Sequence, residues 1–171
     1  MDLDRLIGRM AASAEAIRAL AARVSEEQWP WRPDSASWSI LEVINHLADE
    51  EVEDFRRRLD LLLHRPGEPW PPTDPSGWVT SRSYNERDPE ESLRRFSAGR
   101  RESLRWLGGL ASPDWASECV APWGSKIRAG DIMASWAAHD LLHTRQLVEL
   151  QWAHTLRFDV GLYSVDYAGD W

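Results

Sequence analysis

The sequence predicts an all-α protein that folds as a four-helix bundle with long loops. The chain contains four amphipathic stretches of about 20–25 residues whose apolar side chains recur at helical spacing. Capping residues precede two of these stretches, and segments rich in proline or glycine separate them. We identify no internal repeat and no second domain, so residues 1–171 are expected to form a single domain.

The first two helices follow from periodicity and capping. The first is predicted from about Leu3 to Val24, and a tryptophan- and proline-containing connector follows it. The second begins after Ser39, which forms an S-x-x-E capping box with Glu42. It is expected to continue to about Leu63.

The proline-rich segment from Pro66 to Gly77 is expected to be a non-helical loop. A strong start signal for the third helix comes next, with Asp88 as N-cap and Pro89 at the first helical position. This helix is expected to end near Gly108.

The fourth helix is predicted to begin near Gly130 or Asp131 and to end near Trp152. The tail from Phe158 to Trp171 has no clear periodicity and is expected to be irregular.

Bulk properties exclude several classes of function. The formal net charge of -8 disfavours binding to nucleic acid or to an anionic membrane. The single cysteine, Cys119, precludes an intrachain disulfide and fits a reducing cytoplasm. No apolar run is long enough to span a bilayer, and the N-terminus does not resemble a secretory signal, so a cytoplasmic protein is expected.

The most informative motif is the histidine pair of the fourth helix, His139 and His143. Side chains four residues apart lie on the same face of a helix, about one turn from each other. The pair occupies positions where a bundle helix normally carries leucine, in an apolar seam with alternating steps of four and three. Buried imidazoles need partners for their nitrogens, and a shared divalent metal ion would satisfy both rings. The seam comprises Ile132, Trp136, His139, His143, Gln146 and Leu150.

His46 lies at the edge of the apolar stripe of the second helix and is the candidate third ligand. Three imidazoles from two helices match the ligand count of a metal site that keeps one open position. Glu50, one turn after His46, could reach the same centre as a base or an extra ligand. The alternative is that these histidines are hydrogen-bonded core residues and that Glu50 is solvated.

Three neighbours of the histidine pair have predicted supporting roles. Asp140 and Gln146 could hydrogen-bond the rings and fix their tautomers. Trp136, one turn before His139 on the same face, is the best candidate to line a substrate pocket. The other tryptophans, eleven in all, are interpreted mainly as plugs at the ends of the bundle.

Several motifs resemble those of the DinB-like superfamily of small bacterial four-helix proteins. They are the connector from Trp29 to Ser39, the run WSILEVINHLADEE at Trp38–Glu51, the start AGD at Ala129–Asp131 and the run WAAHDLLHTRQL at Trp136–Leu147. The resemblance covers nearly the whole chain, and the order and spacing of the motifs make it fairly specific.

This resemblance implies an up-down-down-up bundle, often dimeric, with a metal site formed by His46, His139 and His143. Some relatives replace one histidine of the pair with a carboxylate, whereas all three are histidines here. Members of the superfamily include transferases of low-molecular-weight thiols such as bacillithiol or mycothiol, a thiol-dependent isomerase and metal-dependent hydrolases. A homodimer with a small-molecule substrate is therefore expected.

Three functions remain open from the sequence. The first is a metal-dependent transferase that moves a low-molecular-weight thiol to an electrophilic small molecule in detoxification or stress. The second is a metal-dependent hydrolase, and the third is a bundle in which the ion is structural. Zinc is the first choice of ion and nickel the second. Arg100, or failing that Arg145, is a candidate to bind a carboxylate of the thiol, with snorkelling to solvent as the alternative.

Overall fold

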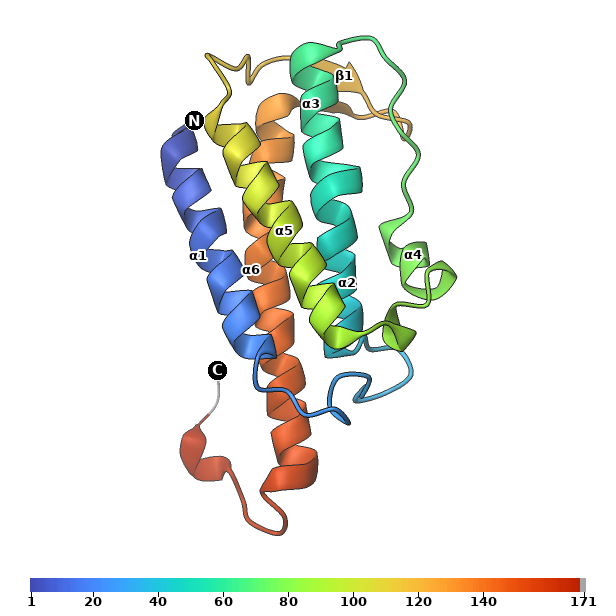
Figure 1. The fold of residues 1–171 in the computed structure, drawn as a ribbon, viewed down its shortest axis with the longest axis vertical. Helices are drawn as coiled ribbons and strands as arrows, with labels where there is room; N and C mark the ends of the chain where they lie inside the picture. The colour runs from blue at the N-terminus through green and yellow to red at the C-terminus, as the bar shows by residue number, and fades with distance from the viewer. Residues whose placement is uncertain (170–171) are drawn as a thin grey trace.

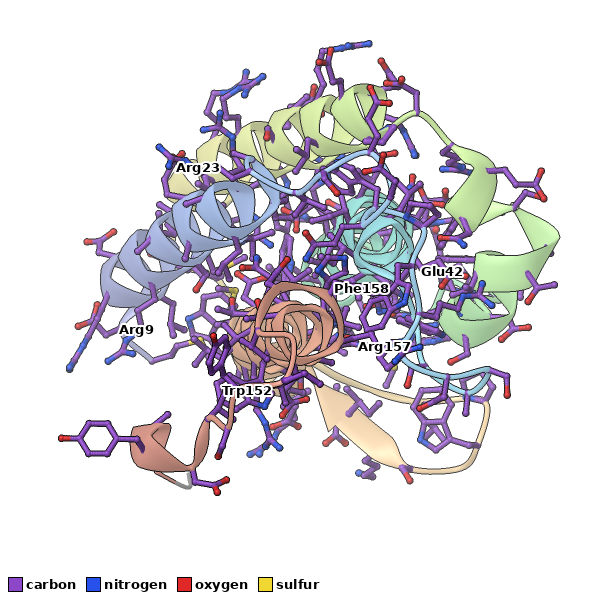
Figure 2. The ribbon with its side chains drawn as sticks, turned by 90° about the horizontal axis from the view of Figure 1, so that it is seen from below. Arg9, Arg23, Glu42, Trp152, Arg157 and Phe158 are labelled. Carbon is purple, nitrogen blue, oxygen red and sulfur yellow. The ribbon has the colours of Figure 1, made fainter. Side chains whose placement is uncertain are left out.

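The computed structural model describes residues 1–169 and has the predicted four-helix bundle (Figure 1). Side chains fill the space between the helices, and Arg9 projects outward from the first of them (Figure 2). The second helical segment is made of α2, a π-helical turn and α3. The long elements are α1 (Leu3–Ala21), α2 (Ile40–Glu50), the π-helical turn (Glu51–Phe55), α3 (Arg56–His64), α5 (Pro89–Gly108) and α6 (Ala129–His154).

The helices run in the order down, up, up, down, which agrees with the topology that the superfamily resemblance implies (Figure 1). Because α2 and α5 run in the same direction, residues 65–88 must return along the length of the bundle. This connection carries the short helix α4 (Pro75–Ser81) and a 3-10 turn (Tyr84–Glu86).

The predicted helix starts are confirmed by their hydrogen bonds. At the start of α2, Ser39 Oγ accepts from the backbone N–H of Glu42 at 3.1 Å, and Glu42 Oε2 accepts from the N–H of Ser39 at 2.8 Å. At the start of α5, Asp88 Oδ1 accepts from the N–H of Glu91 at 2.7 Å. Each cap satisfies donors that the first turn of a helix leaves unpaired.

One prediction about local structure was wrong. The segment expected to be a loop as far as Gly77 already becomes helical at Pro75, because Asp74 caps α4 through the N–H of Gly77 at 3.0 Å. The second helical segment extends to His64, close to the predicted end, but a π-helical turn that the sequence did not indicate begins directly after Glu50. Such turns are frequent at functional sites.

The structure adds a small hairpin that periodicity did not indicate. Strands β1 (Glu118–Val120) and β2 (Lys126–Arg128) pair antiparallel between α5 and α6. Strands this short contain too few residues to show alternation. A π-helical turn (Thr155–Asp159) continues from α6, and the tail beyond it is irregular as predicted except for a 3-10 turn (Asp166–Ala168). Leu162 and Tyr167 are fully exposed, and the last two residues of the chain lie outside the described range.

The core consists of two apolar clusters with a polar layer between them. Along α6, Ile132, Met133 and Trp136 belong to one cluster and Leu147 and Leu150 to the other, while the histidine pair and Asp140 lie between. Within this layer Asp140 and Arg100 are as inaccessible as the clusters, with 0% and 2% of their surface exposed, whereas the His139 side chain is 19% exposed. Buried polar groups require partners, and these partners define the site described below.

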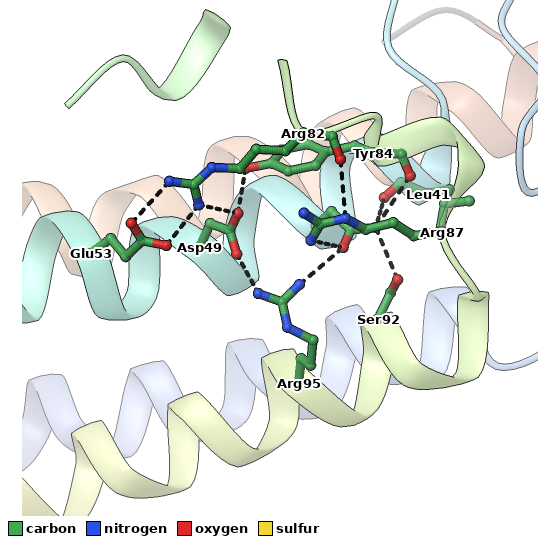
Figure 3. A network of polar contacts seen from close by, with 9 residues as sticks. Leu41, Asp49, Glu53, Arg82, Tyr84, Arg87, Ser92 and Arg95 are labelled. Carbon is green, nitrogen blue, oxygen red and sulfur yellow. Dashed lines mark hydrogen bonds and ion pairs between the residues drawn. The ribbon is translucent and has the colours of Figure 1, made fainter. Parts of the chain in front are cut away.

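A second polar network attaches the long connection to the bundle (Figure 3). The buried carboxylate of Asp49 on α2 accepts hydrogen bonds from Arg82 at 2.6 Å and from the Tyr84 hydroxyl at 2.7 Å, and it pairs with Arg95 of α5. Burial raises the pKa of Asp49, but these hydrogen bonds outweigh it and hold the pKa below its ordinary value. The segment that follows α4 is therefore fixed against the helix that carries His46.

Candidate metal centre

The three predicted histidines lie together between α2 and α6. His46, His139 and His143 each offer a ring nitrogen, and these nitrogens all lie within 4.8 Å of one another. The Nε2 atoms of His139 and His143 are 3.0 Å apart. His46 is buried, and His143 has 9% of its surface exposed. The residues form a possible three-histidine metal site inside the bundle.

Glu50 lies at the same centre. Its Oε2 atom is 2.9 Å from Nε2 of His139 and 3.3 Å from Nε2 of His46. Its helical position brings it there, because residue 50 follows residue 46 by one turn on the same face. The side chain is buried, so the carboxylate is held against the imidazoles rather than solvated.

The protonation states of the rings suit metal binding. Gln146 Oε1 lies 2.8 Å from His143 Nδ1, and a carbonyl oxygen can only accept, so Nδ1 carries the proton and the Nε2 lone pair faces the centre. Burial lowers the pKa of His143 to about 3 and also lowers that of His46. Neutral imidazole is the form that binds a metal ion, so this donor set fits a divalent cation.

Aromatic rings enclose the histidines. The ring of Trp38 lies 4.8 Å from that of His46 and is parallel to that of His143 at 6.3 Å. On the other side, Phe55 lies 5.0 Å from His139. Neither neighbour was predicted to lie at the site: Trp38 was among the tryptophans interpreted mainly as plugs, and Phe55 was given no role. The only signal for Trp38 was its position directly before the cap of the helix that carries His46.

Trp136 and Asp140 make contacts different from those predicted. Trp136 is 1% exposed and donates its indole N–H to Glu51 Oε2 at 3.1 Å, so it lies beneath the site rather than along a pocket. Asp140 points away from the rings and accepts from Arg100 Nη1 at 2.6 Å. Of the two proposed ring partners, Gln146 alone hydrogen-bonds a site histidine.

The side chain of Arg100 is buried and fully hydrogen-bonded within the bundle. Its guanidinium donates to both oxygens of Glu51, to both oxygens of Asp140 and to the carbonyl oxygen of Met10. Arginine has five N–H donors, and these five contacts use them all. Arg100 therefore has no donor left to bind a substrate carboxylate, which was its predicted role. Arg145, the second candidate, is exposed and pairs with Glu149 at 2.7 Å.

A pocket of about 640 Å³ opens beside the centre, with His143 as part of its wall. It lies between the connector that precedes α2 and the C-terminal half of α6. Its lining residues are Pro33, Ala36, Ser37, Trp38, His143, Gln146, Glu149, Leu150 and Ala153.

The chain matches the model of a known protein family. The family model of the DinB superfamily matches residues 9–147, and the chain therefore belongs to this superfamily. A search of curated proteins found no match. In the described residues, no helix has the length and apolar character needed to cross a membrane.

Two solved structures share the fold. YfiT from Bacillus subtilis, described as a probable metal-dependent hydrolase with an unusual four-helix bundle topology, aligns with a TM-score of 0.78 and 18% identity. That alignment covers 89% of this chain and 87% of YfiT. A protein from Exiguobacterium sibiricum 255-15 assigned to the DinB family aligns with a TM-score of 0.60 and 20% identity, over 95% of this chain and 97% of that one.

The contact between Gln146 and His143 leads to a prediction about metal affinity. Gln146→Leu removes the acceptor of His143 Nδ1–H, so we expect the affinity for Zn²⁺ to fall by about 10–100-fold, as loss of such a ring partner does elsewhere. Gln146→Glu keeps an acceptor oxygen in place and should retain the wild-type affinity or exceed it. Competition with a fluorescent zinc chelator measures both. Equal losses in the two variants would contradict the assignment.

Proposed function

We propose that this protein is a metal-dependent hydrolase of small molecules. His46, His139 and His143 would hold one divalent ion, with zinc as the first choice and nickel as the second. The observation that carries the proposal is the position of Glu50, whose carboxylate lies within 3.3 Å of the Nε2 atoms of both His46 and His139. YfiT, which shares only the fold with this chain, is described as a probable metal-dependent hydrolase, and this likeness supports the same class of reaction.

A divalent ion bound by three imidazoles supplies Lewis-acid chemistry: it lowers the pKa of a water or a thiol and polarises a carbonyl group. The chain's own groups perform the remaining tasks. Glu50 is placed to accept the proton of the nucleophile and to return it to the leaving group. Trp38 and Phe55 shield the centre from bulk water, which strengthens electrostatic interactions there. Gln146 fixes the ring orientation and tautomer of His143.

Hydrolysis is favoured over transfer of an anionic thiol because of the charges around the site. A thiol that carries carboxylates would need a cation nearby, but no lysine or arginine is present among the described residues that line the pocket. Arg100 is buried and has no donor left for a ligand.

Transfer of a low-molecular-weight thiol is the second candidate, favoured by the aromatic walls around the histidines. A nucleophilic thiolate would be protected from water by the rings of Trp38 and Phe55. Turnover of 4-nitrophenyl acetate without added thiol supports hydrolysis. The alternative result is turnover of 1-chloro-2,4-dinitrobenzene that requires a thiol, without any ester hydrolysis. This result would show that the protein is a thiol transferase and not a hydrolase.

The variant Glu50→Gln distinguishes a catalytic metal centre from a structural one. We expect this variant to retain one metal ion per chain, because the three imidazoles are unchanged. Its kcat for ester hydrolysis should fall by about 100-fold or more, since a positioned base typically contributes 10²–10⁴-fold. The measurements are elemental analysis and steady-state kinetics of the metal-loaded protein.

The matched control is Glu102→Gln, which changes an exposed glutamate of α5. It should alter neither metal content nor kcat. Unchanged kcat in Glu50→Gln would contradict the assignment of a base. Loss of the ion from Glu50→Gln, together with inactivity of the wild type, would indicate a closed structural site instead.

A further inference from the structure

The pocket beside His143 has a wall in common with the candidate metal centre. His143 lines the pocket, and the Trp38 ring that borders it also contacts His46. A molecule that reacts at the histidines would therefore have the pocket available for whatever part of it projects away from the reacting group. The volume of about 640 Å³ is within the range of small-molecule sites.

Most of the pocket wall is apolar. The indole of Trp38 lines it, together with Pro33 and the edge of the largely buried Leu150. Ala36 and Ala153 leave room because their side chains are small. A wall of this composition gains most by removing an apolar group from water.

The polar groups of the wall indicate the charge of the occupant. Glu149 is the sole acidic residue among the described lining residues, and none of them is lysine or arginine. Gln146 uses its oxygen to accept from His143 Nδ1, so its amide nitrogen is the part that can donate to an occupant. An anionic group in this pocket would find no lysine or arginine among the described residues of the wall, and the one carboxylate of the wall, Glu149, is paired with Arg145 at 2.7 Å, which lies outside the lining.

We propose that this pocket is the subsite for the part of the substrate that projects away from the histidines, and that it accepts an uncharged apolar group such as an aryl ring. The substrates are then neutral aryl or branched alkyl esters or amides rather than anionic ones. This inference rests on the proposed hydrolase function and names its substrate class.

A hydroxamate series tests the subsite by binding, without turnover. Acetohydroxamic acid probes the metal alone, benzohydroxamic acid adds an aryl ring, and 4-carboxybenzohydroxamic acid adds a negative charge at its far end. With the zinc-loaded protein, we expect calorimetry to show at least about tenfold tighter binding of benzohydroxamic than of acetohydroxamic acid, from the apolar area buried. The 4-carboxy compound should lose most of this gain, and Glu149→Gln should recover part of it.

Variants locate the ring in the pocket. Ala153→Trp fills the pocket from α6 and Ala36→Trp fills it from the connector, so either should abolish the gain from the aryl ring. Zinc content and acetohydroxamic acid affinity should stay at wild-type values. The matched control is Ala134→Trp at an exposed position of α6 outside the pocket, which should leave the gain intact. Circular dichroism shows whether each variant folds. If one of the two pocket variants misfolds, the other still tests the subsite.

The inference is overturned if benzohydroxamic acid binds no tighter than acetohydroxamic acid, if the 4-carboxy compound keeps the full gain, or if both filled variants retain it. These outcomes concern the aryl increment alone. The hydrolase proposal is tested separately, by zinc content, ester turnover and the Glu50→Gln variant, so the two can fail independently.

Discussion

Replacing Arg100 with methionine is expected to lower the free energy of unfolding by about 3–5 kcal/mol, the usual effect of removing one partner of a buried ion pair. The guanidinium is 2% exposed and pairs with Glu51 at 2.7 Å and with Asp140 at 2.6 Å. Methionine fills a similar volume but leaves two carboxylates facing each other in the interior. Neither carboxylate can reach water, because both side chains are 1% exposed.

The expected decrease in Tm is about 10 °C for a domain of this size. Thermal and urea unfolding followed by circular dichroism measure the two quantities. Arg101→Met is the matched control, because Arg101 is the next residue of α5 and is exposed. A surface substitution of this kind should change stability by less than about 0.5 kcal/mol. Similar losses in the two variants would show that the buried pairing contributes nothing specific.

A triple variant tests the electrostatic explanation. Combining Arg100→Met with Glu51→Gln and Asp140→Asn removes all three charges and should recover a large part of the lost stability, because the cost of breaking a buried ion pair comes from the charge left without a partner. The same network also positions the site, because Glu51 follows Glu50 and Asp140 follows His139. Zinc affinity should therefore fall in Arg100→Met and not in Arg101→Met.

Local signals predicted most of the fold. The capping residues Ser39 and Asp88 act within a few residues of themselves, so their hydrogen bonds can be anticipated from spacing. The three histidines of the candidate metal centre could also be predicted, because periodicity assigns each to the inner face of its helix. Two inward faces of a small bundle must meet, which brings the single histidine of α2 towards the pair on α6.

The contacts of Arg100 were not predictable in the same way. The sequence shows only that an arginine interrupts an apolar stripe, and snorkelling to solvent is the common outcome. Its actual partners lie 49 and 40 residues away in sequence, on other elements. Their choice depends on how deeply α5 is buried and on the π-helical turn that carries Glu51. The contacts of Trp38 with the histidines were not predicted for a related reason, because they depend on the path of an irregular connector.

Removing one imidazole should abolish metal binding. We expect wild-type protein purified with zinc to contain about one ion per chain, as a three-histidine site implies. His139→Ala should contain almost none, and its affinity should fall by more than the 10–100-fold expected for loss of a ring partner. His139 is central because its Nε2 lies 3.0 Å from that of His143 and 2.9 Å from Glu50 Oε2.

Metal removal should also reduce the stability of the wild type and leave that of His139→Ala unchanged. A ligand at 100 times its Kd stabilises the folded state by about 2.7 kcal/mol, so a chelator should lower the Tm of the wild type alone. The matched control is His64→Ala, because His64 is half-exposed at the end of α3 and pairs with Asp60. It should bind zinc as the wild type does. If His139→Ala retained stoichiometric zinc and the same response to chelator, the ion would be bound elsewhere. The three histidines would then not be the metal site, and the hydrolase proposal would be wrong.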